Sequence, residues 1–124
     1  MYDPSELLYT AEHLWIEVDG DTAKLGITDY AQEQLGEILY ANLPLEGDLY
    51  RTGEAFAEIE SAEVTAELPA PFELEVLSVN QDLDTAPELI NEDAFAAWIA
   101  EVKILEMEEL DNLLSSDDYE ENLE

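Results

Sequence analysis

Side chains capable of acid–base or nucleophilic chemistry are present in this chain, but few stand in an arrangement that indicates catalysis. His13 is the only histidine, so a packing or hydrogen-bonding role is a better interpretation than a metal site. Glu58 and Glu60 could exchange protons as a carboxylate pair, yet such pairs arise by composition alone when 33 residues are acidic. The five serines lack a convincing base or oxyanion motif. A small hydrolase is therefore the weakest function considered.

Two acidic clusters near the C-terminus could attract divalent cations weakly. They comprise Glu106, Glu108 and Glu109, and the pair Asp117 and Asp118. Neither has the alternating oxygen ligands and the glycine that make a calcium-binding loop specific. Solvated surface charge is the better interpretation, and no metal site is predicted.

A hairpin is predicted around the segment Glu60-Ser61-Ala62-Glu63-Val64. Residues 55–60 alternate small or apolar side chains with acids, which is typical of a strand. Residues 65–68 can form the return strand, with residues 61–64 as the turn. Glu63 should therefore stand at the tip of a hairpin that projects into solvent.

Another hairpin and a short helix are predicted before this segment. Bulky and β-branched residues at 14–18 and 22–27 flank Asp19-Gly20-Asp21, which is typical of a hairpin turn. A helix over 30–35 can be capped by Thr28 or Asp29 and ended by Gly36.

The rest of the chain predicts more strands and a helical C-terminus. Strands are expected over 37–43, 49–51, 72–79 and 97–104, and helical segments over 106–114 and through Tyr119 and Leu123. Five aromatic residues lie within apolar patterns and are predicted in the core: Trp15, Trp98, Tyr30, Tyr40 and Phe56. Many short strands with a terminal helix indicate a mainly β sandwich or barrel, and the length fits a single domain over residues 1–124.

The charge of the chain excludes several classes of partner. Its formal net charge of -30, from 33 acidic and three basic residues, repels phosphate backbones and anionic lipids, so nucleic-acid and membrane roles are not expected. The chain has no cysteine and no apolar run near the roughly 20 residues of a membrane span. A cytoplasmic protein is predicted. A requirement for salt is one expectation, and either a halophilic cytoplasm or the redesign of a surface would explain the acidic composition.

Specific motifs extend over almost the whole chain, from about Tyr9 to Leu123. They are Y-T-A-E-H-L-W at 9–15, G-I-T-D-Y-A-Q at 26–32, L-G-E at 35–37, L-P at 43–44, Gly47, E-S at 60–61, A-P at 70–71, V-N at 79–80, P-E-L-I-N-E-D at 87–93 and Trp98. With these motifs the chain resembles the H protein of the glycine cleavage system, a family of lipoyl carriers.

The resemblance implies a barrel-sandwich hybrid, the lipoyl- and biotinyl-domain fold, with a lipoyl-lysine at a hairpin tip. Such a carrier is not itself an enzyme. Its lipoyl arm takes an aminomethyl group from glycine decarboxylase, offers it to the aminomethyltransferase and is reoxidised by dihydrolipoamide dehydrogenase. A lipoate ligase is a further implied partner.

The chain departs from the family pattern at the residue that holds the cofactor. The family hairpin has E-S-x-K, and here Glu63 stands at the position of the lysine. No lipoyl group is therefore expected on this chain, because a carboxylate cannot form the amide. Leu74, Ala96 and Ala97 stand where the family usually has glycines, and a side chain at a left-handed glycine costs on the order of 1 kcal/mol.

Two functional hypotheses follow. The first is an H-protein-like domain that is inactive as a carrier, an engineered or divergent acidic scaffold with residual docking to the family partners. The scarcity of basic residues throughout the chain favours this origin for Glu63. The second is an acidic module that binds cations or a basic partner protein and releases them at high salt.

Overall fold

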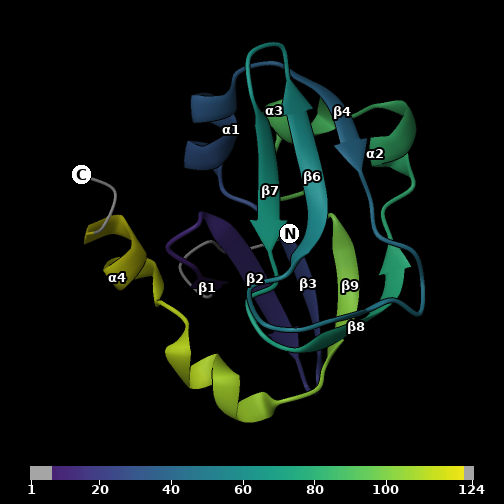
Figure 1. Cartoon of the computed structure of the whole chain (residues 1–124). Coiled ribbons are helices and arrows are strands. Elements are labelled where there is room, and N and C mark those ends of the chain that lie inside the picture. The colour runs from purple at the N-terminus through teal and green to yellow at the C-terminus, as the bar shows by residue number, and fades with distance from the viewer. Residues whose placement is uncertain (1–6, 122–124) are drawn as a thin grey trace.

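The computed structural model describes residues 7–121 and contains two antiparallel sheets (Figure 1). The larger sheet has the order β1 (Leu8–Tyr9), β2 (Leu14–Asp19), β3 (Thr22–Ile27), β9 (Ala100–Ile104), β8 (Leu74–Val79) and β5 (Leu49–Tyr50). The smaller sheet has the order β4 (Ile38–Asn42), β6 (Ala55–Ser61) and β7 (Thr65–Pro69). The predicted mainly β, barrel-sandwich architecture is confirmed.

Five short helical segments in the described part of the chain flank the sheets. They are α1 (Asp29–Leu35), α2 (Asp82–Thr85), α3 (Leu89–Glu92), the 3-10 helix η2 (Met107–Asn112) and α4 (Ser116–Glu121). None of the helices in the described part of the chain has the length and apolar character needed to cross a membrane. The terminal helix was predicted, although Leu123 lies outside the described residues.

The core lies between the two sheets. Alternate residues of the facing strands are buried, such as Leu14 and Ile16 in β2, Leu25 and Ile27 in β3, and Ile59 in β6. The strands β2 and β3 themselves were predicted from their bulky and β-branched residues on either side of Asp19-Gly20-Asp21. The apolar contacts across the two sheets hold the smaller sheet, and with it the β6–β7 hairpin, in place.

A second buried cluster lies on the other side of β2. It consists of Leu7, Tyr9, Trp15 and Tyr119, with Phe95, Trp98 and Leu114 packed against it. Trp15 is directly opposite Gly26 on β3, and a Cβ at Gly26 would lie 2.5 Å from the indole ring. Glycine is thus required at this position because the indole of Trp15 occupies the space of a side chain.

The N-terminal end of α1 is capped as its sequence predicts. Of the two candidates, Thr28 is the cap residue, and its Oγ accepts a hydrogen bond from the Ala31 N–H at 3.2 Å. Gly36 ends the helix with a φ of 81°, a left-handed conformation that glycine adopts without steric cost.

Two expectations from the sequence are wrong. Tyr40 was predicted in the core but is 64% exposed, because a bulge between Ile38 and Tyr40 breaks the alternation of β4. The last strand was predicted from residue 97 but begins at Ala100, since the Ala97 N–H instead donates to the Asp93 carbonyl in a turn.

The residues that replace the family's usual glycines are accommodated without left-handed backbone. His13 is the only non-glycine residue with positive φ between residues 7 and 121, so Leu74, Ala96 and Ala97 are not strained in this way. Leu74 is fully buried in β8, where it pairs with Tyr50 and Ile104. Its side chain therefore contributes to the core.

Candidate functional site at the β6–β7 hairpin

The predicted hairpin is present, and its tip lies at the end of the smaller sheet, at the top of the molecule in Figure 1. Glu60 is paired with Thr65, and the Ser61 N–H donates to the Val64 carbonyl at 2.9 Å. Ala62 and Glu63 form the two-residue loop between them. The sequence thus predicted both the hairpin and the residue at its tip.

A serine side chain closes the turn. The Ser61 Oγ accepts from the Val64 N–H at 3.2 Å and from the Glu63 N–H at 3.4 Å. Two-residue hairpin loops usually need positive φ to bring the backbone carbonyl into reach, and neither Ala62 nor Glu63 has it. The hydroxyl of Ser61 therefore supplies the acceptor, which fixes the direction in which residue 63 leaves the turn.

The tip presents a carboxylate to solvent and no amine. Ala62, Glu63 and Val64 are all exposed. The two lysines lie in the larger sheet: Lys24 is in β3, with its Nζ 5.3 Å from the ring centre of Trp98, and Lys103 is in β9. Neither lysine belongs to the hairpin.

The P-E-L-I-N motif links the end of α1 to the strand next to the hairpin through Asn91. The side chain of Asn91 accepts from the Ile38 N–H at 2.8 Å and donates to the Gly36 carbonyl at 2.9 Å and to Gln32 Oε1 at 2.8 Å. Ile38 in turn pairs with Ser61. Asn91 therefore joins the end of α1 to the strand that flanks the tip.

His13 has the structural role that was predicted for it. Its Nδ1 is 2.8 Å from the Tyr119 hydroxyl, which is 2.7 Å from Thr28 Oγ. Partial burial lowers the pKa of His13, opposed by the nearby negative charge of Glu12. Burial also raises the pKa of the Tyr119 hydroxyl, against its hydrogen bond to Thr28. These bonds join α4 to the start of α1.

The acidic residues considered as metal ligands are not gathered into a site. Within residues 7–121, no group of three or more His, Cys, Asp or Glu side chains is placed to hold a metal ion. Glu109 instead uses its carboxylate to accept from the Glu73 N–H at 2.8 Å and from the Thr52 hydroxyl at 2.5 Å. These hydrogen bonds join η2 to the loops that contain Thr52 and Glu73.

One arrangement was missed from the sequence. Glu58 on β6 lies directly opposite Glu67 on β7, and both side chains line a hollow beside β4. The register of the hairpin could have revealed this pair. Once Glu60 is placed opposite Thr65, antiparallel pairing puts residue 58 opposite residue 67.

A barrel-sandwich of two sheets with one projecting hairpin defines the class of lipoyl-type carrier domains. A family model described as "Glycine cleavage H-protein" matches residues 7–124. The chain belongs to the glycine cleavage system H protein family, whose members are carriers and not catalysts.

Individual relatives agree with this assignment. The glycine cleavage system H protein of Clostridioides difficile (strain 630) is 48% identical over 120 residues, covering 96% of each chain. That of Alkaliphilus oremlandii (strain OhILAs) is 46% identical over 93% of this chain and 91% of its own length. The crystal structure of the H protein from Mycobacterium marinum superposes with a TM-score of 0.82 at 31% identity, covering 94% of this chain and 95% of that one.

Proposed function

We propose that this chain is an H-protein-like domain that does not carry a lipoyl group. The observation that carries this proposal is the exposed carboxylate of Glu63 at the hairpin tip, the position at which the E-S-x-K pattern has its lysine. The residues present at the tip thus do not fit the cofactor of the family.

The chemistry of attachment supports the proposal. A lipoyl amide forms when the ε-amine of a lysine attacks an activated lipoyl carbonyl and then loses a proton from its nitrogen. Glu63 has no nitrogen with which to form this bond. The only lysines of the chain, Lys24 and Lys103, lie in strands of the larger sheet, where the flanking E-S motif and the turn are absent.

The surroundings of the tip retain the features expected of a carrier. The turn closed by Ser61 and the link from Asn91 to Ile38 are both in place. These features support residual docking to the enzymes that handle an H protein: a lipoate ligase, glycine decarboxylase, the aminomethyltransferase and dihydrolipoamide dehydrogenase. A chain that docks without a cofactor would act as a competitor of a loaded H protein.

Intact mass tests the proposal. The unchanged protein, the Glu63→Lys variant and a Glu67→Lys control are incubated with a lipoate ligase, lipoate and ATP. We expect the mass of one lipoyl group to be added to the Glu63→Lys variant alone. The control carries the same new amine on the same hairpin, in β7 and away from the turn, so it separates recognition of the tip from the mere presence of a lysine.

Two outcomes would contradict the proposal. A lipoyl group on the unchanged protein would show that the chain carries the cofactor without a lysine at position 63. An equal gain in mass in both lysine variants would show that the ligase does not distinguish residue 63 at the hairpin tip from residue 67.

A further inference from the structure

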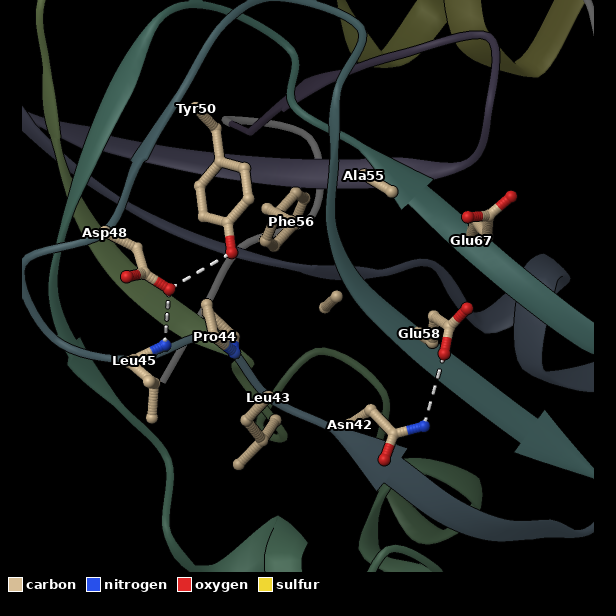
Figure 2. Close-up of a pocket in the computed structure, with 11 residues that line it drawn as sticks. Asn42, Leu43, Pro44, Leu45, Asp48, Tyr50, Ala55, Phe56, Glu58 and Glu67 are labelled. Carbon is tan, nitrogen blue, oxygen red and sulfur yellow. Dashed lines mark hydrogen bonds between the residues drawn. The ribbon is translucent and has the colours of Figure 1, made fainter.

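A hollow of about 290 Å³ lies beside the end of β4 and is lined by residues of both sheets (Figure 2). It is open to solvent and is bordered by the end of β4 and the loop that follows, by the β5 region and by the paired strands β6 and β7. Its lining residues include Leu43, Pro44, Phe56, Glu58 and Glu67. The hollow shares none of these residues with the 61–64 turn.

One side of the hollow is apolar. Leu43, Pro44 and Leu45 line it from the loop after β4, and the ring of Phe56 lies behind them next to Tyr50 (Figure 2). Phe56 is held in the core at 2% exposure, whereas Leu45 is 72% exposed. Leu45 thus offers an apolar side chain at the mouth of the hollow, next to the half-buried Leu43, to which a partner side chain could add contacts.

The opposite side is acidic. Glu58 and Glu67 face each other across β6 and β7, with their carboxylates on the outer face of the sheet (Figure 2). Like charges directly opposite each other destabilise a strand pair. Glu58 Oε1 accepts only a long hydrogen bond, 3.4 Å, from Asn42 Nδ2. A cation placed between the two carboxylates would relieve this repulsion.

The rest of the lining adds negative charge and no positive charge. Asp48 accepts hydrogen bonds from the Leu45 N–H at 3.1 Å and from the Tyr50 hydroxyl at 3.2 Å. Burial raises the pKa of Tyr50, and the negative charges of Asp48 and Glu54 raise it further. The lining residues, all within the described part of the chain, include no lysine or arginine. The hollow therefore combines an apolar wall with an uncompensated negative one.

We propose that this hollow is a docking site for a basic, amphipathic segment of a partner protein. An arginine of that segment would place its guanidinium between Glu58 and Glu67, and a neighbouring aliphatic side chain would pack on Leu43 and Leu45. Charge complementarity selects this occupant, because a nucleic acid or an anionic lipid would be repelled by the same carboxylates. The site is independent of the hairpin tip and of the proposed loss of the lipoyl group.

A short peptide serves as the probe. An acetylated and amidated peptide of alternating arginine and leucine is titrated into the uniformly ¹⁵N-labelled full chain at about 0.1 M salt, where the Debye length is roughly 10 Å. A peptide with glutamine in place of arginine is the neutral control. We expect saturable amide shifts confined to residues 41–58 and 66–68, and none with the neutral peptide.

Paired variants separate the hollow from the general charge of the surface. Glu58→Gln with Glu67→Gln should weaken binding of the arginine peptide about fivefold. Glu120→Gln with Glu121→Gln removes the same charge from α4, on the far side of the molecule from β4 in Figure 1, and should change affinity less than about twofold. Leu45→Ser should weaken binding about threefold without loss of fold, because its side chain is already exposed.

Three results would overturn the inference. The first is the absence of binding at this salt concentration. The second is an equal effect of the two paired variants, which would indicate attraction to the net charge alone. The third is a set of shifts spread evenly over the acidic surface. Because none of these measurements involves residue 63, they remain decisive whether or not the Glu63→Lys variant accepts a lipoyl group.

Discussion

The hairpin tip and the aromatic cluster around Trp15 differ in how their side chains are held. At the tip, Ala62, Glu63 and Val64 are exposed, and the side chain of Ser61 makes the hydrogen bonds that close the turn. In the cluster, Trp15 is fully buried and its Nε1–H donates to the Ala94 carbonyl at 3.1 Å. Tyr119 stacks on Tyr9 with ring centres 4.7 Å apart.

This difference bears on the proposed loss of lipoyl attachment, which would leave the fold of the family intact. A residue in the cluster has contacts on all sides, so a change there leaves a cavity or an unpaired polar group. Residue 63 has almost no contacts to lose. A change of the side chain at residue 63, such as the proposed replacement of a lipoyl-lysine by Glu63, should therefore cost little stability, and the two regions can be separated by mutation.

The largest difference in the free energy of unfolding is expected between Trp15→Ala and Glu63→Ala. Loss of the buried indole should reduce the free energy of unfolding by about 4 kcal/mol, since both a cavity and an unpaired Ala94 carbonyl result. Glu63→Ala should change it by less than about 0.5 kcal/mol. Urea denaturation followed by tryptophan fluorescence of Trp98 measures both variants; losses within about 1 kcal/mol of each other would refute the contrast.

A smaller effect is expected for Tyr119→Phe against Tyr40→Phe. The Tyr119 hydroxyl bonds both His13 and Thr28, so its removal should cost about 1 kcal/mol. Tyr40 is exposed on β4, and loss of its hydroxyl should cost less than about 0.3 kcal/mol. Urea midpoints at constant pH and salt test the pair, and equal midpoints for the two variants would show that the hydroxyl network adds nothing.

Much of the fold could be predicted from the sequence because its signals are local. Bulky and β-branched residues on either side of Asp19-Gly20-Asp21 predicted β2 and β3, and Thr28 and Gly36 predicted the bounds of α1. The burial of Tyr40 was predicted wrongly because a bulge changes the alternation of β4, and the position of a bulge cannot be recognised from the apolar pattern of the sequence. The prediction also failed at residues 93–97, where a turn replaces the expected start of the strand.

For the candidate site, the sequence predicted the identity and place of the tip but not its support or surroundings. Glu63 was located from the motif alone. The bonds from Asn91 to Ile38 and from Tyr119 to Thr28 join residues 53 and 91 positions apart, which no local pattern reveals. The hollow beside Glu58 and Glu67 depends likewise on how the loop after β4 folds over β6.

At the tip itself, Ser61→Ala should give a measurable effect where Glu63→Ala gives almost none. Loss of the hydroxyl removes the acceptor of the Val64 N–H and should destabilise the chain by about 0.5 kcal/mol. Amide exchange at Glu63 and Val64 should become faster while exchange in β2 is unchanged. Ser61→Thr keeps the hydroxyl and is the control. Equally fast amide exchange in Ser61→Thr would show that the loss of the hydroxyl is not the cause of the effect in Ser61→Ala.

The smallest expected effect is a pH dependence that originates from His13. Burial lowers the pKa of folded His13 below its ordinary value of 6.5, so the unfolded chain binds the proton first as pH falls. The contribution of neutral His13 to stability is therefore complete above pH 6.5 and decreases as pH falls through that value. The groups that face the ring are Tyr30, Tyr119 and the carboxylate of Glu12. The negative charge of Glu12 raises the pKa of His13 and so opposes the effect of burial.

Urea denaturation midpoints measure this pH dependence. Between pH 8 and about pH 5.5 the midpoint should fall more in the unchanged protein than in His13→Gln, which lacks the imidazole but keeps the same carboxylates. Parallel curves for the two proteins would mean that burial beside Tyr119 does not affect the protonation of His13, and that the packing around Trp15 does not extend its influence to this imidazole.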